Sequence, residues 1–372
     1  MEHYLDNAAT TKPCAEAAAA VMSCISSHYG NPSSLHRKGL EAQHEVEYAR
    51  NQVAGALGWK AQEIVFTSGA TESTNLALCG AAAAYGRKRK KIITSAVEHA
   101  SVRETMAHLE TLGFTVVSVP PAEDGLYHAE DFLKEVDKDT CMVSIMLVNN
   151  ENGYRMPVEE VFRTVKRRDP DIITHCDAVQ GFLKVSFKPR TLCADLVSLS
   201  GHKVHALKGA GALYIRQGVR LKPVLYGSRQ EKGLRPGTEG VPVIAAFGAA
   251  AEKLVLTMDE RYDAVSGLRS SLIEQLKEMD GVIIRDLPSA SPYVLNISLL
   301  GYRSEIVLHY LEQREVYISS GSACSKGASS GVLELFGAKP AEVDSALRIS
   351  FCSDNTEEDI AALVQGLKDA QK

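Results

Sequence analysis

The 372-residue sequence lacks the features of membrane, secreted and disulfide-stabilised proteins. No run of apolar residues reaches the length of a membrane span. The amino terminus, MEHYLDNAATT, has neither the basic start nor the apolar stretch of a signal peptide. None of the eight cysteines belongs to a CxxC pair, and a chain of this length needs no disulfide framework. We therefore expect a cytoplasmic protein that has no membrane partner.

An excess of positive charge and the common nucleotide-binding motifs are also missing. The formal net charge is −5, so no overall basic field favours nucleic acid, and we expect no direct nucleic-acid partner. The basic run GRKRKK at 86–91 is most simply a solvated connection. The stretch SGATE at 68–72 has neither the Lys-Ser/Thr of a P-loop nor the spacing of a dinucleotide fingerprint.

The sequence does contain a regular alternation of short apolar runs and helical patterns between residues 62 and 214. This alternation predicts an α/β fold with a mostly parallel sheet sandwiched by helices. A long helical stretch over 242–279 leads into a second region of mixed strands and helices. We expect a large domain over 15–250, and a smaller α+β domain formed by 1–14 and 251–372.

Polar clusters follow five of the predicted strands. Ligands of open parallel sheets bind beyond the carboxyl ends of the strands, so five such clusters together predict a site. The clusters are SGATE (68–72), VEH (97–99), NNENG (149–153), DAVQ (177–180) and SGHK (200–203).

The residue types in these clusters suggest one cofactor. Small residues at a helix start, as in SGATE, suit a small phosphate. Asp177, directly after a buried strand, needs a partner such as a protonated ring nitrogen. Lys203, between small and polar residues, can form a Schiff base, and His99 can stack on a flat ring and move protons. Together these groups describe pyridoxal phosphate.

Each group taken alone has a plainer structural explanation. A single lysine is usually solvated, and a single histidine is usually a hydrogen-bonded structural group. A metal site is not expected, because adjacent residues such as His175, Cys176 and Asp177 point to opposite faces of a strand. The combination of the groups therefore carries the prediction.

Motifs along the chain identify a family. The sequence resembles the cysteine desulfurases of the NifS/IscS type, in the class V aminotransferase group of fold-type I pyridoxal phosphate enzymes. The resemblance implies a seven-stranded sheet in the large domain. The matching stretches keep the family's order and cover essentially the whole chain: YLDNAATT, GNPSSLH, SGATES, VEHAS, VNNENG, HCDAVQ, SLSGHK, KGAGALY, QEKGLRPGTE, SSGSACS and ALRISF.

The resemblance implies roles around the cofactor. Lys203 holds pyridoxal 5′-phosphate covalently as an aldimine, while Asp177 and Gln180 address the ring nitrogen and the ring hydroxyl. Thr238 reaches the cofactor phosphate of a partner subunit, which implies a homodimer with shared sites. The residues expected to hold the phosphate within one chain are Ala70, Thr71, Ser200 and His202.

The resemblance also implies the substrate contacts and the reaction. His99 stacks on the ring, Asn150 lies by the ring hydroxyl and the substrate, and Arg348 clamps the carboxylate of L-cysteine. Cys324 takes the substrate sulfur as a persulfide and leaves alanine. Because its neighbours in SSGSACSKGA are small, we expect this segment to move cheaply and carry sulfur to an acceptor such as an iron–sulfur scaffold.

The sequence leaves alternative functions open. The alternatives are a selenocysteine lyase, another class V lyase and a non-catalytic sulfur-assembly scaffold.

The sequence departs from the family pattern at several positions. These departures concern substrate access and partner surfaces more than chemistry. They are Thr74, Met156, Ala206-Leu207 and Ser228-Arg229.

Overall fold

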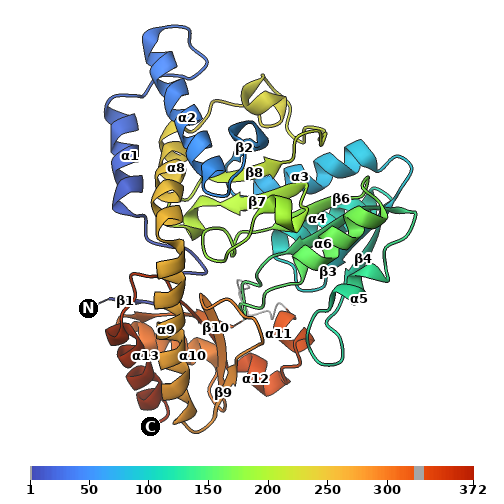
Figure 1. The fold of residues 1–372 in the computed structure, drawn as a ribbon. Coiled ribbons are helices and arrows are strands. Elements are labelled where there is room, and N and C mark those ends of the chain that lie inside the picture. Colours follow the sequence, from blue (N-terminus) through green and yellow to red (C-terminus); the bar gives the residue numbers. More distant parts are fainter. Residues whose placement is uncertain (1, 322–330) are drawn as a thin grey trace.

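The computed structural model describes residues 2–321 and 331–372, and a seven-stranded sheet forms its centre (Figure 1). The strand order is β2-β8-β7-β6-β5-β3-β4. β8 runs antiparallel to β2 and β7, and the remaining pairs are parallel, which confirms the expected mostly parallel sheet. The strands are β2 (Ile64–Thr67), β3 (Lys91–Ser95), β4 (Thr115–Val119), β5 (Thr140–Met146), β6 (Ile173–Asp177), β7 (Leu196–Ser200) and β8 (Gly211–Ile215).

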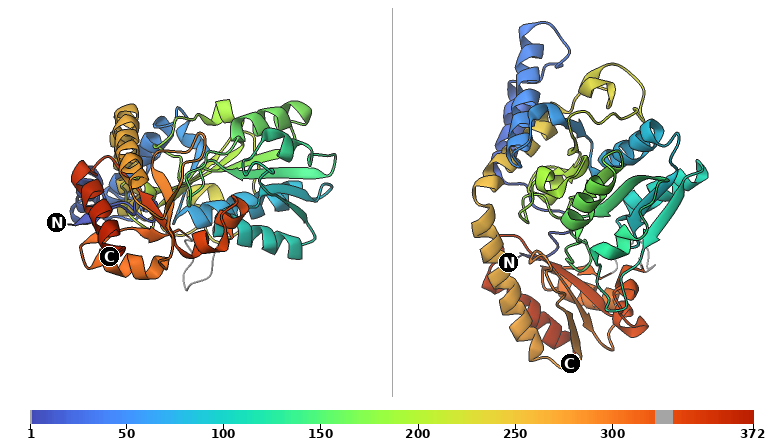
Figure 2. Two further views of the ribbon diagram at one scale, coloured as in Figure 1. Left: turned by 90° about the horizontal axis from the view of Figure 1, so that it is seen from below. Right: turned by 45° about the vertical axis from the view of Figure 1, so that its right-hand side comes forward.

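Helices cover both faces of this sheet, as Figure 2 shows from below. Successive strand residues point to opposite faces, so Ile92 packs against α3 and α4 while Ile93 joins the core formed with α2, α6 and α8. This explains the continuous apolar runs in the strands. The helices of this region are α1 (Ala15–Ser26), α2 (Arg37–Gly55), α3 (Ala70–Tyr85), α4 (Ala100–Thr111), α5 (Ala129–Leu133), α6 (Val158–Arg168), α7 (Pro189–Leu192) and α8 (Val241–Leu256).

A second, four-stranded antiparallel sheet has the order β12-β13-β10-β9 and lies at the bottom of Figure 1. It has a core of its own, which includes Leu5 from the amino terminus. The division into domains 15–250 and 1–14 with 251–372 stays a prediction. The elements are β1 (His3–Tyr4), α9 (Met258–Lys277), β9 (Val282–Arg285), β10 (Val294–Leu299), α10 (Ser304–Glu312), β11 (Val316–Tyr317), β12 (Ser319–Ser320), α11 (Val332–Leu335), α12 (Pro340–Asp344), β13 (Ala346–Ser350) and α13 (Glu357–Ala370).

The long helix expected over 242–279 is wrong. The chain forms two helices, α8 and α9, which meet at an angle of 77°. At the break Thr257 leaves helical geometry, with φ −121° and ψ 21°. The Arg261 guanidinium donates to the Leu254 carbonyl, which would otherwise accept an intrahelical bond. A side chain four residues beyond the break thus ends α8.

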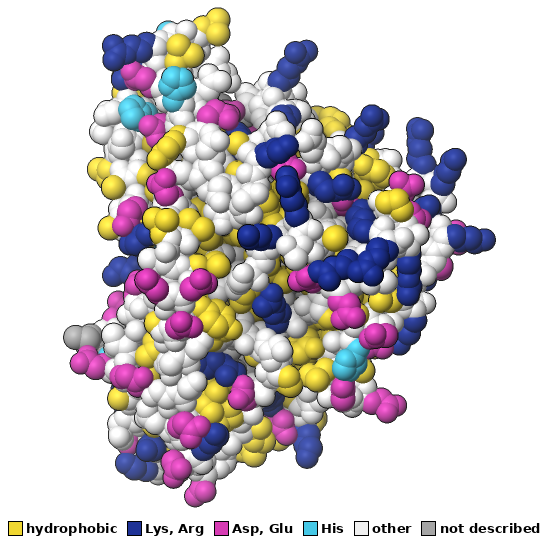
Figure 3. Space-filling model, viewed as in Figure 1, with side chains coloured by type: hydrophobic (Ala, Val, Ile, Leu, Met, Phe, Trp, Pro, Cys, Tyr) yellow, Lys and Arg dark blue, Asp and Glu magenta, His cyan; other side chains and the backbone are white. Residues whose placement is uncertain are grey.

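Charged side chains are unevenly spread over the surface. Lys and Arg side chains are most frequent on the right-hand side of the face in Figure 3, the side on which Figure 1 places α6. Among the described helices, none alone has the length and apolar composition of a membrane span, and only the bent pair α8–α9 meets both criteria together.

Candidate active site

A cavity of about 870 Å³ opens where β5, β6 and β7 end and β12 and β13 of the second sheet approach. The polar clusters after the strands therefore do meet in space, together with residues from the carboxyl-terminal region. The expected site residues that line the cavity are Ala70, Thr71, His99, Asn150, Asp177, Gln180, Ser200, His202, Lys203 and Arg348.

Lys203 occupies the short 3-10 turn η2 (Gly201–Lys203) directly after β7. Its Nζ donates to the carbonyl oxygens of Ala8 and Ala9, at 2.6 Å each. Burial, with the positive charge of Arg348 as the next cause, lowers the pKa of Lys203 to about 8. About a tenth of this amine is therefore neutral and nucleophilic at pH 7, far more than for an ordinary lysine.

Asp177 ends β6 and is 5% exposed. Its Oδ1 accepts a hydrogen bond from the backbone N–H of Val179 at 3.0 Å. Burial raises the pKa of Asp177, and the positive charge that His99 can carry opposes that rise. A cation placed in the cavity would stabilise the ionised carboxylate in the same way.

His99 caps the start of α4 and leaves its ring open to the cavity. Its Nδ1 accepts from the backbone N–H of Ser101 at 3.1 Å, so the proton of the neutral ring is on Nε2. The cap thus fixes both the tautomer and the orientation of the imidazole.

One end of the cavity is built for an anion. α3 begins there with Ala70 and Thr71, and the first N–H groups of a helix have no intrahelical partner. Ser200 Oγ is buried without a hydrogen-bond partner among the described residues. Gly211 on β8 lies so close to Gly69 that an added Cβ would fall 2.6 Å from its backbone. Glycine at this position lets β8 approach the start of α3.

Arg348 projects from β13 and is 3% exposed. Its Nη1 donates to the backbone oxygen of Asn150 at 3.1 Å. Its Nη2 donates to Asp6 and to Ser319 Oγ, both at 3.0 Å, and its Nε is buried with no partner in the described parts of the chain. The guanidinium is therefore held in place by three of its five N–H donors, and the N–H on Nε and one on Nη1 make none of these bonds.

The sequence interpretation missed several residues that line this cavity or contact its lining. Asp6 and the carbonyls of Ala8 and Ala9 come from the stretch YLDNAATT, which was matched as a motif without a role for any residue. Glu98 was passed over for its neighbour His99. The Glu98 side chain lines the cavity and accepts hydrogen bonds from Ser95 Oγ and the Met146 N–H. Burial raises the pKa of Glu98 to about 8.

Two predicted site residues remain, Thr238 and Cys324. Thr238 is exposed and does not line the cavity of its own chain. Cys324 lies outside the described residues. The described chain reaches the start of its segment at Ser319, whose Oγ donates to Asp6 at 2.7 Å.

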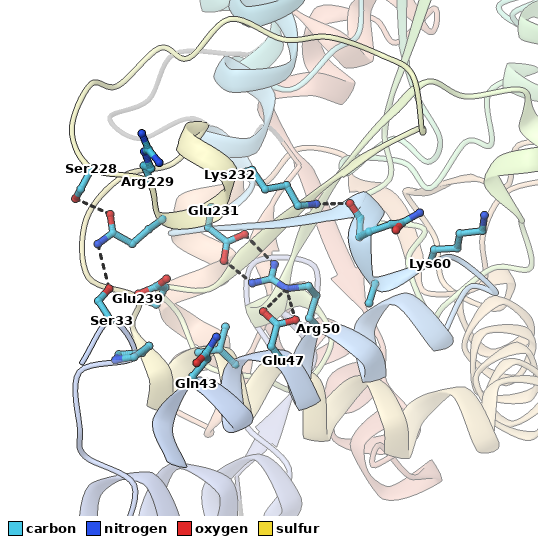
Figure 4. Close-up of a pocket in the computed structure, with 15 residues that line it drawn as sticks. Ser33, Gln43, Glu47, Arg50, Lys60, Ser228, Arg229, Glu231, Lys232 and Glu239 are labelled. Atoms are coloured by element: carbon cyan, nitrogen blue, oxygen red, sulfur yellow. Dashed lines mark hydrogen bonds and ion pairs between the residues drawn. The ribbon is translucent and has the colours of Figure 1, made fainter. Parts of the chain in front are cut away.

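A second cavity, of about 1210 Å³, contains none of the expected site residues (Figure 4). In it Arg50 forms a buried ion pair with Glu231, whose Oε2 also accepts from the Phe66 N–H. Of the departures, Ser228 and Arg229 line this cavity. Thr74 instead donates to Ser198 at 3.3 Å, while Met156 and Ala206 are buried in the core.

Comparisons with known proteins show which structures and sequences this chain is similar to, and to which family it belongs. A solved structure described as a NifS-like protein superposes with a TM-score of 0.94 and 37% identity, covering 100% of this chain and 99% of its own. A NifS/IcsS protein homolog of Lactobacillus delbrueckii is 40% identical over 96% of this chain and 94% of the relative. A Nostoc protein named cysteine desulfurase is 38% identical over 97% and 91%. Residues 3–363 match the aminotransferase class-V family, and the chain belongs to it.

The residues of the cavity fit pyridoxal phosphate, the cofactor that this family implies. The unpartnered Ser200 Oγ and the start of α3 suit its phosphate. The buried Asp177 suits its ring nitrogen, and the weakly basic Lys203 suits its aldehyde. Gln180 and His99 also line the cavity.

Proposed function

We propose that the protein is a cysteine desulfurase that uses pyridoxal phosphate to move sulfur from L-cysteine to Cys324, releasing alanine. The observation that carries the proposal is the meeting of Lys203, Asp177, His99 and Arg348 in one cavity. Relatives named cysteine desulfurase, 37–39% identical over most of the chain, support the choice of reaction.

The chain's own residues would hold the cofactor by its separate groups. The start of α3, with Ser200 and His202, binds the phosphate, and Asp177 holds a proton on the ring nitrogen. His99 presents its ring to the cofactor ring. When bound, pyridoxal phosphate supplies an electron-accepting ring that acidifies the α-hydrogen of an attached amino acid.

The substrate is oriented by charge and then loses a proton. Arg348 binds the carboxylate of L-cysteine through its fork of N–H donors. Asn150, whose backbone oxygen already contacts Arg348, lies on the same side of the cavity. Lys203 Nζ takes the α-proton as general base, and its lowered pKa near 8 suits that task.

The sulfur transfer balances without an external oxidant or reductant. The C–S bond of L-cysteine breaks, and an S–S bond forms at the Cys324 sulfur. L-cysteine and one protein thiol give alanine and one protein persulfide. The persulfide then passes to an acceptor, such as an iron–sulfur scaffold protein, in the cytoplasm.

We infer a homodimer in which each subunit completes the other's site. Thr238 is exposed and outside its own cavity, so it is free to reach the phosphate in a partner. Nearby surface is apolar: Tyr29, Leu35 and Tyr226 are 69%, 95% and 87% exposed. A second copy is the occupant that would cover these side chains.

The test uses the cofactor-loaded protein with L-cysteine, and measures alanine and protein-bound persulfide with and without reductant. Wild type should form alanine and a persulfide on Cys324, and Cys324→Ala should form neither at the wild-type rate. Lys203→Ala should abolish turnover. Equal alanine production by wild type and Cys324→Ala would contradict the proposed sulfur transfer.

A further inference from the structure

Lys184, in the turn after β6, is a buried lysine that the proposed reaction does not use. It is 5% exposed, and its Nζ donates to Gln180 Oε1 at 3.1 Å. Burial and the positive charge of Lys203 lower its pKa to about 7. Burying a lysine against a neutral amide costs free energy, so its burial in this place calls for a reason.

The bond from Lys184 decides which way the Gln180 amide faces. The ammonium form of a lysine has only donors, so it requires the amide to turn its oxygen toward Nζ and its NH2 group away. The Gln180 Nε2 then donates to the Ala8 carbonyl at 2.9 Å. Gln180 lines the candidate active site, so the second N–H of this group remains available to a ligand there.

The backbone on which Lys184 sits is also specially held. Leu183 has φ +56°, in the left-handed region that a branched side chain rarely adopts. Its carbonyl accepts from Arg261 Nη2 at 2.8 Å. A strained turn that is fixed by a buried arginine directs the next side chain inward.

Lys184 and Lys203 belong to one hydrogen-bonded chain. The Ala8 carbonyl accepts from both Gln180 and Lys203, so the order is Lys184, Gln180, Ala8, Lys203. Lys184 and Lys203 also line one small cavity, together with Arg261, Tyr293 and Cys352. The two lysines therefore stand on either side of the Gln180 amide.

We propose that Lys184 is a positioning residue that locks the Gln180 amide with its NH2 group toward the cofactor. The proposal rests on the proposed function, because it assigns the ring oxygen of pyridoxal phosphate as the acceptor of the free N–H. A donor at that oxygen stabilises its anionic form, and so lowers the pH at which the bound cofactor's absorbance titrates.

The experiment is a spectral titration of the cofactor-bound proteins, with the cofactor dissociation constant measured beside it. Lys184→Met should move the midpoint upward by about half a unit to one unit, and weaken cofactor binding about 3- to 10-fold, as expected for the loss of one hydrogen bond. Gln180→Met should give the same shift. The double variant should shift no further, because both changes remove one interaction.

Three outcomes would overturn the proposal. An unchanged midpoint in Lys184→Met would reduce the lysine to a structural role. A larger shift in the double variant than in either single variant would mean that Lys184 acts on Lys203 directly. An unchanged midpoint in Gln180→Glu would show that the NH2 group is unimportant. Since that carboxylate can pair with Lys184, this variant remains informative even where Lys184→Met does not fold.

Lys166→Met is the matched control. Lys166 is also a largely buried lysine, but it pairs with the buried Asp195 and donates to the carbonyls of Pro170 and Ile172, outside the candidate active site. The Lys166→Met variant should have a lower free energy of unfolding than wild type and the same midpoint in the spectral titration. A wild-type protein that binds no cofactor would instead defeat the proposed function, so the two failures are distinguishable.

Discussion

The Lys203 amine has three charged neighbours that act in opposite directions. After burial, the charge of Arg348 lowers its pKa, whereas Asp6 and Asp177 raise it. Arg348 and Asp6 form an ion pair at 3.0 Å, so the two effects are linked. A substitution at Arg348 should therefore change the pKa of Lys203, even though the two side chains have separate roles.

This linkage predicts a pH dependence for cofactor attachment. The neutral amine reacts, so the attachment rate of cofactor-free protein should rise about tenfold per pH unit below pH 8 and level off above it. The positive charge of Arg348 favours the neutral form of Lys203. Arg348→Ala removes that charge, so it should move the midpoint of the attachment rate to higher pH. Stopped-flow absorbance measures the rate. A midpoint near 10.5 in wild type would contradict the lowered pKa.

The carboxylate clamp is a second prediction about single residues. Arg348→Ala should raise the KM for L-cysteine about 10- to 100-fold, with a smaller effect on kcat, because it removes a charge-assisted fork. Arg348→Lys is the matched variant. It keeps the charge, so the attachment midpoint should stay near that of wild type while the KM still rises. Steady-state kinetics with an unchanged KM in Arg348→Ala would refute the clamp.

At the scale of elements, a buried polar ladder joins three strands and a helix. His175 on β6 bonds to Ser144 on β5 at 2.8 Å and to Ser198 on β7 at 2.9 Å. Thr74 of α3 donates to the same Ser198 hydroxyl. The departure at Thr74 is thereby accommodated within the fold, away from the cavity.

The ladder predicts acid destabilisation. Burial lowers the pKa of His175 to about 3, well below its usual 6.5. The unfolded chain therefore binds more protons below pH 6.5, and the free energy of unfolding falls as the pH drops. This group should contribute a loss of about 2 kcal/mol between pH 7 and pH 5. Urea unfolding of His175→Gln should show a smaller loss.

An exposed histidine supplies the comparison. His128 pairs with Asp124, which raises the pKa of the imidazole rather than lowering it. His128→Gln should keep the full acid-dependent loss of wild type. If His175→Gln lost as much stability as wild type between these pH values, the ladder would not be the source.

Two features of the secondary structure, strand β8 and the break between α8 and α9, were not predicted from the sequence pattern. β8 was not among the predicted strands, because Gly211 and Ala212 give it little apolar character and it pairs antiparallel with strands distant in sequence. The break between α8 and α9 depends on Arg261 reaching Leu254 and Leu183. Helical periodicity continues through that point, so only the packed structure reveals the bend.

At the scale of the whole molecule, the cavity lies between two sheets, and exposed apolar side chains lie outside it. Gln230 Nε2 lies 3.5 Å from Ser33 Oγ, so the segments that carry Leu35 and Tyr226 adjoin. Both belong to the upper part of the molecule in Figure 1, near α2. This surface is where we expect the second copy.

The dimer prediction is tested by mass. Wild type should have twice the 40.3 kDa mass of the chain by light scattering after size exclusion. Leu35→Asp with Tyr226→Asp should yield the single-chain mass, because charges at a buried apolar contact oppose association. Leu112→Asp is the control, since Leu112 is 55% exposed at the end of α4. A monomeric wild type would exclude shared sites.

Much of the candidate site could be predicted from sequence, since its residues follow strands of a parallel sheet whose ends converge. Lys203, Asp177 and His99 are examples. Asp6 and Lys184 could not, because their significance comes from partners far away in the chain or from burial: Asp6 meets Arg348, and Lys184 faces the Gln180 amide. Pattern alone gives neither pairing.

The sequence by itself determined six of the seven strands, their helical cover and the residue types at the strand ends, because periodicity and turn chemistry are local properties. Tertiary structure alone decided the position of the amino terminus, where residues 6–9 bring one carboxylate and two carbonyls to Arg348 and Lys203. It also decided the charge balance at Lys203. Long-range contacts set burial and the distances between charges, and these quantities fix a pKa.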